Sequence, residues 1–328
     1  MNRSPSKVNP APETREHLRA PQTSKAGAVP KVRAAAAFLS LMGRLPGGIA
    51  LLILGDAPAM AGSAAQPGQT VGLPAGAQLP VGLYFVNTSS FGVRNTRPLD
   101  SESNINLPAF VWATPWSLFG ARLNLIAIQP VVAASPRGTP YQSGISQPLL
   151  AGQLAWSLGN HVGVSYLFGG YLPVETRFVT QNASFTHRFA ASYTGDGLNL
   201  TANLLYGIFI DPISPQKSVY PDYLNLDLTA TKKFGKWEIG PVAFASTDLP
   251  TRFPGYRRQG QIAVGGLVGY NFGPVNLQAY VTRDVAERNY GGRETRGWLR
   301  VIVPIYKEST NAAAPSIPVT GPARIARQ

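Results

Sequence analysis

Few residues of this chain have the type and spacing that catalysis requires. His161 lies beside a short turn, and His187 lies in ASFTHRFAAS with Ser184 three residues before it. A serine paired with a histidine could act as a nucleophile on a lipid ester. Residues three apart on an extended strand point to opposite faces, so this strand alone does not form the pair. The sequence predicts that the protein is not an enzyme, and a membrane-embedded lipid-modifying enzyme that uses His187 remains an alternative.

Signatures of cofactor, metal and nucleic-acid binding are also missing from the sequence. Cysteine is absent, which excludes disulfides, thiolate catalysis and cysteine metal sites. No G-x-S-x-G, H-E-x-x-H, phosphate-loop or dinucleotide pattern is found. Of the net charge of +13, residues 1–61 carry +5, and the other +8 is scattered without a long basic run. We expect no cofactor, no metal and no nucleic-acid partner.

Asp227 is the most informative polar residue, because it alternates with leucines in YLNLDLTATKKF. In an extended strand, Leu226 and Leu228 face one side, and Asp227 faces the other. A carboxylate cannot face hydrocarbon cheaply, so it must meet water or a partner such as Arg122 or Arg300. The alternative is an ordinary solvated acid on the surface of a soluble sheet.

Short segments that alternate apolar and polar residues would position these side chains, and they recur from about residue 81 onward. Each is near or above the length with which a tilted strand crosses a bilayer, about 9 to 11 residues. We predict twelve strands, at residues 81–91, 102–113, 121–133, 148–158, 161–172, 183–194, 198–210, 222–233, 236–247, 260–271, 274–284 and 294–306.

The connections between these strands alternate strictly between short and long. The short ones are 115–120, 159–160, 195–197, 234–236 and 272–274, and the longer polar ones include 134–146, 211–221, 248–259 and 285–293. Outer-membrane barrels have short periplasmic turns and longer outer loops. Greek-key sandwiches lack this alternation, and soluble up-and-down barrels typically have eight strands and an apolar interior.

Composition agrees with a membrane barrel. Only 14% of residues are charged, against roughly 25% in soluble domains, yet the mean hydropathy is −0.01. No segment after the leader approaches the 18 or more consecutive apolar residues of a spanning helix. The apolar residues are therefore dispersed along alternating strands. The predicted fold is all-β, a transmembrane up-and-down antiparallel β-barrel of about 12 strands.

The inward and outward faces follow from polarity, because polar groups that face lipid cost several kcal/mol. The residues predicted to face the lumen are Arg122, Asn124, Gln153, Asn199, Thr201, Asn203, Asn225, Asp227, Thr229, Asn276, Gln278 and Arg300. Trp112, Trp116, Trp156 and Trp237 lie close to short turns and are predicted to form an interfacial girdle, with packing in a soluble core as the alternative. We expect arginine to be tolerated at Asn225 and to block assembly at Leu226.

The ends of the chain have different compositions from the barrel. Residues 1–61 are predicted to be an export leader with the apolar core IALLIL and the cleavage pattern Ala59-Met60-Ala61, and Met42 is a possible true start. Residues 62–80 are rich in small residues and proline and are predicted to be a flexible lead-in. The barrel is expected at 81–306, followed by a tail at 307–328.

Several stretches resemble the outer-membrane proteins grouped as the phenol-degradation MetA-pathway family. They are LPVGLYFVN, PAFVWATPWSLFGARLNL, LLAGQLAWSLGNHVGVSYLFGGYLP, YLNLDLTATKKFGKWEIGPVAFAS and VGGLVGYNFGPVNLQAYVTRDV, and together they span roughly 79–306. The resemblance implies uptake of small hydrophobic or aromatic compounds across a bacterial outer membrane. It implies no catalytic residues.

From the barrel and the resemblance we predict a multi-pass outer-membrane channel for passive permeation of small apolar or aromatic solutes. A general or anion-preferring porin is an alternative, suggested by the charge of +8 after the leader and by Arg252, Arg257 and Arg258 in one loop. A structural barrel without transport is another. The expected partners are outer-membrane lipid and the barrel assembly machinery, although many such barrels end on an aromatic residue and here a tail follows Tyr306. The oligomeric state and any lumen plug are left open.

Overall fold

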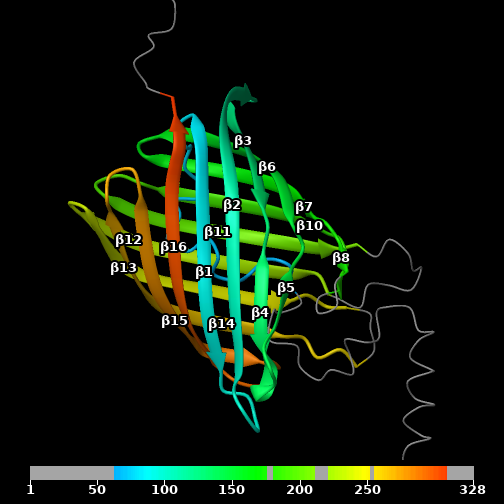
Figure 1. Ribbon diagram of the computed structural model, residues 1–328. Coiled ribbons are helices and arrows are strands. Elements are labelled where there is room, and N and C mark those ends of the chain that lie inside the picture. The colour runs from blue at the N-terminus through cyan, green and yellow to red at the C-terminus, as the bar shows by residue number, and fades with distance from the viewer. Residues whose placement is uncertain (1–62, 176–179, 211–220, 252–254, 309–328) are drawn as a thin grey trace, which may run out of the picture. The chain divides into compact units, whose positions relative to one another are not determined.

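The computed structural model describes residues 63–175, 180–210, 221–251 and 255–308 (Figure 1). All of them lie within one compact unit, Gly47–Gln328. The predicted leader and nearly all of the predicted tail lie outside the described residues, as does Arg252. No helix in the described ranges is long and apolar enough to cross a membrane.

One antiparallel sheet closes on itself to form a barrel of twelve wall strands. Closure occurs at β1 (Gly82–Arg94), which pairs along its whole length with both the second and the last strand. The other wall strands are β2 (Ser101–Leu118), β3 (Ala121–Ile128), β6 (Leu149–Gly159), β7 (Val162–Tyr171), β10 (Ser184–Tyr193), β11 (Leu198–Phe209), β12 (Tyr223–Phe234), β13 (Trp237–Asp248), β14 (Gly260–Asn271), β15 (Asn276–Arg288) and β16 (Glu294–Lys307). The prediction of a twelve-stranded up-and-down barrel is confirmed.

One wall strand is interrupted where the sequence predicts continuity, within 121–133, and a short strand lies inside the predicted loop 134–146. β4 (Val131–Ser135) continues β3 after Gln129–Pro130, and β5 (Gln142–Ile145) precedes β6 across residues 146–148. Pro130 and Pro148 have no N–H for the ladder, which explains both breaks. The Ser146 amide donates to Pro130 O at 2.9 Å, so the two breaks are joined across the wall. The short elements η1 (Pro136–Gly138), β8 (Val174–Glu175) and β9 (Thr180–Gln181) lie in the long connections.

The connections divide the barrel into a short-turn end and a long-loop end. One of the two-residue turns is Asn160–His161, whose φ angles of 49° and 61° are those of a type I′ hairpin. Gly235 in the turn between β12 and β13 also has a positive φ, 62°. Such turns match the right-handed twist of the strands and leave no room for a long loop. The pattern of short and long connections in the sequence therefore corresponds to two opposite rims.

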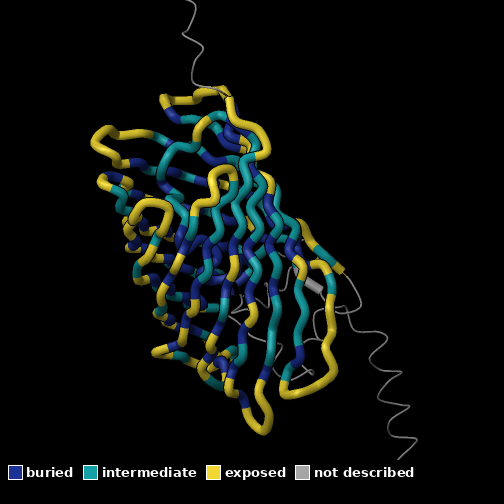
Figure 2. Tube along the Cα trace, turned by 60° about the vertical axis from the view of Figure 1, so that its left-hand side comes forward, coloured by how far each residue is buried: buried dark blue, intermediate teal, exposed yellow. Residues whose placement is uncertain are grey.

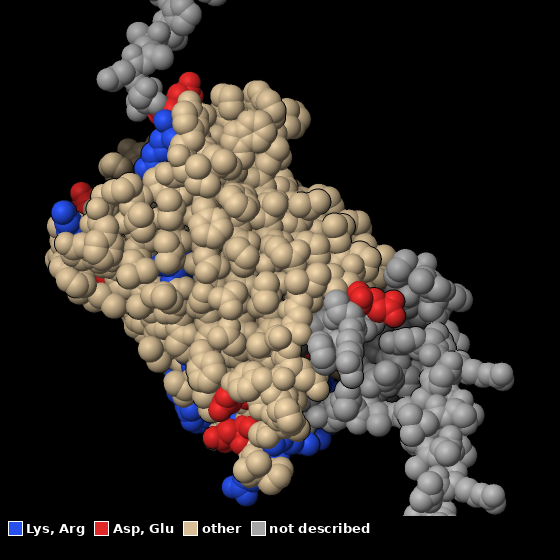
Figure 3. Space-filling view, viewed as in Figure 1, with Lys and Arg blue, Asp and Glu red and all other residues tan. Residues whose placement is uncertain are grey.

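The burial pattern is that of an inside-out protein. Along β12, Asn225, Asp227 and Thr229 are buried, whereas Leu228 is 40% exposed on the outer face. Buried and exposed positions alternate along most of the wall strands (Figure 2). In the view of Figure 3, charged side chains gather toward the ends of the molecule, and a broad, nearly uncharged band lies between them. Such a band suits a bilayer, because apolar side chains face acyl chains.

Candidate functional site: the filled lumen

The lumen is filled by the segment Ser63–Pro80, hereafter the lumen segment. It contacts Asn225 near the long-loop end through Ser63, and it reaches Arg122 at the short-turn end through Leu79. Most of its residues from Ser63 to Gly72 are buried. The composition of this stretch predicts a flexible lead-in. The structure instead packs this segment inside the barrel, because side chains of distant strands bind its backbone.

Glycine allows the lumen segment to fold into consecutive turns against the wall. Gly68 and Gly72 have φ angles of 84° and 85°, and successive turns are closed by bonds such as Leu73 N to Thr70 O at 3.0 Å. A Cβ on Gly68 would lie 2.6 Å from Phe244 Cδ1, and one on Gly76 would lie 2.7 Å from the backbone of the wall. Larger residues at these positions would push the segment away from the wall.

Asp227 holds the middle of the lumen segment. Its Oδ1 accepts a hydrogen bond from the Gly68 amide at 2.9 Å. Its Oδ2 accepts from the Thr70 amide at 2.9 Å and from the Thr70 hydroxyl at 2.6 Å. The partners of this carboxylate are therefore backbone and hydroxyl donors, and the two arginines proposed from the sequence are not among them. A buried carboxylate with three donors is well satisfied without an ion pair.

Arg300 holds the same segment by donating hydrogen bonds to its backbone carbonyls. It is fully buried, its Nη2 donates to Gln69 O at 2.6 Å, and its Nη1 donates to Val71 O. Its Nε donates to Thr88 Oγ1 at 2.8 Å on β1. Asp227 thus binds amide hydrogens and Arg300 binds carbonyls of the same few residues. Together they fix both sides of one peptide stretch.

The remaining predicted lumen residues also lie on the inner side of the wall, and most of them bind the lumen segment directly. The contacts are Asn199 Nδ2 to Gly72 O at 3.0 Å, Gly72 N to Thr229 Oγ1 at 2.8 Å, Gln278 Nε2 to Gly72 O at 3.1 Å, Asn203 Nδ2 to Thr70 Oγ1 at 2.7 Å, Gln153 Nε2 to Ala75 O at 3.1 Å and Asn225 Nδ2 to Ser63 Oγ at 2.9 Å. Arg122 Nη1 donates to Leu79 O at 3.0 Å. Asn124 and Thr201 bond to wall neighbours, and Asn276 is half-buried at the start of β15.

Aromatic rings form a layer beside the middle of the lumen segment. Tyr280 and Trp298 stack with ring centroids 5.1 Å apart and an interplanar angle of 12°, and Phe244 meets Trp298 edge-on at 6.4 Å. All three are buried. The sequence analysis missed Trp298, although it lies two residues from Arg300 and so shares its face. These rings give an otherwise polar lumen an apolar surface.

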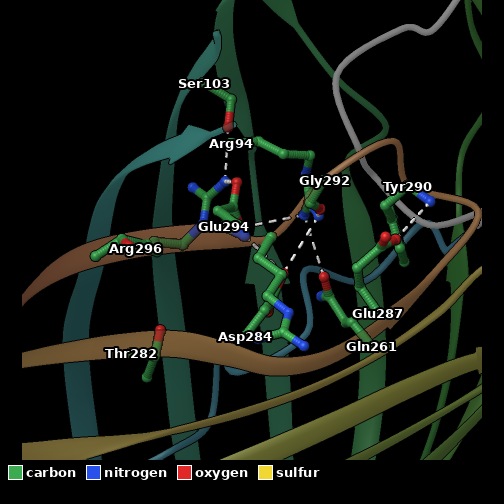
Figure 4. A network of polar contacts seen from close by, with 12 residues as sticks. Arg94, Ser103, Gln261, Thr282, Asp284, Glu287, Tyr290, Gly292, Glu294 and Arg296 are labelled. Atoms are coloured by element: carbon green, nitrogen blue, oxygen red, sulfur yellow. Dashed lines mark hydrogen bonds and ion pairs between the residues drawn. The ribbon is translucent and has the colours of Figure 1, made fainter. Parts of the chain in front are cut away.

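A buried network of ions lies at the long-loop end of the lumen (Figure 4). Arg94 Nη1 is 3.2 Å from Asp284 Oδ2, and Arg94 Nη2 is 3.6 Å from Glu294 Oε2. Arg296 Nη2 is 2.7 Å from Glu294 Oε1. The network links the first strand with the last two, so it secures the seam at which the barrel closes. Burial raises the pKa of the neighbouring Tyr290, in the loop after β15, above the ordinary value of a tyrosine.

The four predicted girdle tryptophans lie on the outer face toward the short-turn end. Trp112, Trp116 and Trp237 are 40%, 54% and 51% exposed. Trp112 and Trp116 meet edge-on with centroids 5.2 Å apart, and Trp156 Nε1 donates to Phe119 O at 3.0 Å. An indole with an apolar face and an N–H is suited to a membrane–water interface.

The candidate catalytic pair does not form. Ser184 is buried on the inner face, 1% exposed, while His187 lies on the outer face, where its Nδ1 is 2.9 Å from Tyr166 OH. Within the described ranges, no group of three or more acidic or histidine side chains could hold a metal ion.

Two broad grooves lie on the outside of the barrel. Grooves of about 720 Å³ and 550 Å³ are lined mainly by outward residues such as Leu200, Leu228 and Phe168, so they face the bilayer. Beside the lumen segment, the cavity between Gln69 and Ile105 measures only about 10 Å³, the space of about one water molecule. The lumen segment therefore leaves little free volume at this level of the barrel.

Loosening the Asp227 clamp should make the lumen segment accessible. Asp227→Asn keeps the shape of the side chain but offers one acceptor oxygen to three donors, and each buried hydrogen bond that is lost costs about 1–3 kcal/mol. Because the chain contains no cysteine, a single reporter Ala65→Cys can be labelled with a water-soluble maleimide. We expect labelling at least about tenfold faster in the Asp227→Asn background. A cysteine reporter at exposed Asp196 should be labelled at the same rate in the wild-type and Asp227→Asn backgrounds. An unchanged labelling rate at position 65 would show that the hydrogen bonds of Asp227 are not needed to hold the lumen segment.

The fold and the lumen define a closed, antiparallel barrel of the outer-membrane type with an internal segment. The chain belongs to the family described as "Putative MetA-pathway of phenol degradation", whose sequence profile matches residues 84–301. A comparison with curated protein sequences gives no match.

Among solved structures, an outer membrane channel of Pseudomonas putida F1 is similar, with a TM-score of 0.57 and 14% identity over 73% of this chain and 99% of that one. The translocator domain of the autotransporter NalP of Neisseria meningitidis has a TM-score of 0.39 and 11% identity, over 83% and 97% of the two chains. The first similarity supports the barrel fold, and the second adds nothing to it.

Proposed function

We propose that the protein is a channel in a bacterial outer membrane, through which small hydrophobic or aromatic compounds diffuse passively. The observation that carries the proposal is a closed barrel whose lumen is filled by a segment held by hydrogen bonds to wall side chains. These bonds join wall side chains to the segment and are not part of the strand ladder, so displacement of the segment leaves the ladder of the wall intact. The family description, which names phenol degradation, and the similar outer membrane channel of Pseudomonas putida F1 support the same class of function.

The lining of the lumen favours aromatic solutes over inorganic ions and sugars. The stacked rings of Tyr280 and Trp298 offer faces on which an aromatic ring can stack, a contact worth about 0.5–1.5 kcal/mol beyond area burial. The lumen segment obstructs the wide aqueous passage of a general porin. A solute that passes must displace part of this segment, and an apolar solute gains from the rings that are then uncovered.

An anion-preferring porin is the second candidate, because arginines are prominent in the lumen. Arg188, Arg296 and Arg300 are buried on the inner face, and Arg257 and Arg258 are exposed in the loop before β14. Most of the buried arginines bind acidic groups or carbonyls, which reduces their effect on a passing anion. Ion selectivity in planar bilayers distinguishes the two candidates, since a strongly conducting, anion-selective wild-type pore would favour the porin.

Uptake by whole cells tests the proposal. Cells that produce the full chain should take up radiolabelled phenol or naphthalene several-fold faster than cells with an empty vector, with no gain for labelled glucose. Cells that produce a variant unable to assemble, Leu226→Arg, control for expression stress. Equal uptake of the aromatic probes with and without an assembled barrel would contradict the proposal.

A further inference from the structure

Arg188 is a buried cation with unused hydrogen-bonding capacity. It points into the lumen from β10 and is 9% exposed, and neither its Nε nor its Nη2 has a hydrogen-bond partner. The ion pairs found among the described residues join other arginines to Asp284 and Glu294. An unpaired buried charge is among the most costly features a protein interior can hold, so a partner for this guanidinium is expected.

Two buried hydroxyls on the same strand also lack hydrogen-bond partners. Ser184 and Thr186 precede Arg188 at alternate positions, so all three side chains face the lumen. Ser184 and Thr186 are 1% and 0% exposed, and neither hydroxyl has a hydrogen-bond partner. Three consecutive inward positions of β10 therefore carry unsatisfied donors, whereas most inward polar residues of the neighbouring strands bind the lumen segment.

Tyr223 adds a further hydroxyl from across the neighbouring strand. Gly207 of β11 lies between Thr186 and Tyr223 in the ladder, and a Cβ on Gly207 would lie 2.0 Å from Tyr223 Cζ. The ring thus lies over Gly207. The Tyr223 hydroxyl is fully buried near Ser63 and Ala65 but makes no hydrogen bond of normal geometry. Arg188 is close enough to interact electrostatically with this hydroxyl and with that of Tyr171.

Nearby groups of the wall do not neutralise Arg188. Asp227 interacts electrostatically with Arg188, but both carboxylate oxygens of Asp227 already accept hydrogen bonds from Gly68 and Thr70. Asn203 Oδ1 and Asn225 Oδ1 are free acceptors, but they carry no charge. What the site lacks is a negative charge with acceptor oxygens.

An apolar surface lies on the other side of Tyr171. Tyr171 of β7 lines the small cavity together with Ile105 and Leu107 of β2 and Ile128 of β3, which lie two to three strands further along the wall. The long-loop half of the lumen therefore offers donors and a positive charge on one side and apolar side chains on the other. The cavity beside Tyr171 has a volume of only about 10 Å³, which admits no organic solute. A ligand would therefore occupy the space now filled by Ser63–Gln69.

We propose that Arg188, with Thr186, Ser184 and Tyr223, binds the carboxylate of a small aromatic acid while its ring lies against the apolar wall. A guanidinium matches a carboxylate in geometry and charge, and such charge-assisted bonds are the strong ones. The inference rests on the proposed function, since it assigns the solute class of that channel. It predicts that acids are preferred over neutral aromatics of the same size.

Equilibrium dialysis of the purified full-length protein in detergent tests the site, with radiolabelled benzoate and benzyl alcohol as probes. We expect Arg188→Gln to weaken benzoate binding at least about tenfold and benzyl alcohol binding less than twofold. Arg188→Lys should retain part of the benzoate affinity because it retains the charge, and Thr186→Val should lose several-fold. Arg283→Gln, which removes an exposed arginine on the outer face of β15, is the matched control and should bind benzoate like wild type.

Equal benzoate binding by wild type and Arg188→Gln, or no saturable benzoate binding by wild type, overturns the site. If Arg188→Gln fails to fold, judged by heat-modifiable migration in gels, Arg188→Lys and Thr186→Val decide. Proteoliposome influx of benzoate at pH 8 separates the two proposals. Influx that is equal in wild type and Arg188→Gln retains the channel and removes the site, whereas no influx of benzoate and no aromatic uptake by cells removes the channel.

Discussion

Deletion of Ser63–Leu79 is expected to turn a nearly silent barrel into a conducting pore. The lumen segment occupies the interior between the wall side chains, and the wall itself closes through β1 without it. Twelve strands enclose an interior between the ligand-sized one of eight strands and the aqueous channel of sixteen. Single-channel recording in planar bilayers should show a conductance at least about tenfold above wild type.

Two controls make this result interpretable. Arg122→Gln removes only the contact with Leu79 and should stay nearly silent, and Asp227→Asn should give brief openings between the two extremes. A deletion variant that assembles, as judged by heat-modifiable migration, yet conducts like wild type would mean that other residues close the lumen. In that case the lumen segment would be structural, and the proposed route through the lumen would fail.

The second large effect concerns the lipid-facing side of β12. Leu226 lies on the outer face as the fourth of the twelve residues of β12, and arginine there should cost up to about 2–4 kcal/mol in the hydrocarbon. We expect Leu226→Arg to abolish the heat-modifiable folded form in outer-membrane fractions. Phe234→Arg places the same side chain on the same face at the short turn, where the cost is about 0–1 kcal/mol, so it should assemble. Equal assembly of both variants would mean that this face does not meet hydrocarbon.

Asn225→Arg is not a suitable control for the lipid-facing variant, because this position is occupied by a contact with the lumen segment. The sequence predicts that arginine is accepted there because the side chain points into a wet lumen. In the structure, Asn225 is 3% exposed and its Nδ2 donates to Ser63 Oγ and Ala65 O. An arginine would overpack this contact and push out the start of the lumen segment. It should therefore raise accessibility at Ala65 while leaving the wall intact.

The wall of this protein could be read from the sequence because its determinants are local. Alternation in segments such as YLNLDLTATKKF places Asp227 opposite Leu226 whatever the rest of the chain does, since successive residues of a strand point to opposite faces. Turn chemistry is equally local, as at Asn160–His161. Even so, the interruption at Pro130 was missed, because an apolar run on either side of the proline hides the missing donor. β5 was assigned to a loop, because its sequence QSGI lacks the apolar alternation of a strand.

The sequence predicts on which face of a strand each residue of the candidate site lies, but it does not predict which residue that side chain contacts. The period of two places Asp227 and Arg300 inside, and the same period would have added Trp298, Arg296 and Asp284. It could not pair Asp227 with Gly68, because the two residues are 159 positions apart and the contact uses a backbone amide that has no sequence signature. The network of Arg94, Glu294 and Asp284 is set by closure of the first strand on the last.

By itself, the sequence predicted the two faces of each strand and the number of strands in the barrel, since successive residues of a strand point to opposite faces and turn signals separate one strand from the next. Only the tertiary structure decided that residues 63–80 fill the interior. That stretch has no period of its own, and its conformation comes from hydrogen bonds to Asp227, Arg300 and other side chains far along the chain. A segment whose backbone is satisfied by distant partners looks like a flexible linker until those partners are brought around it.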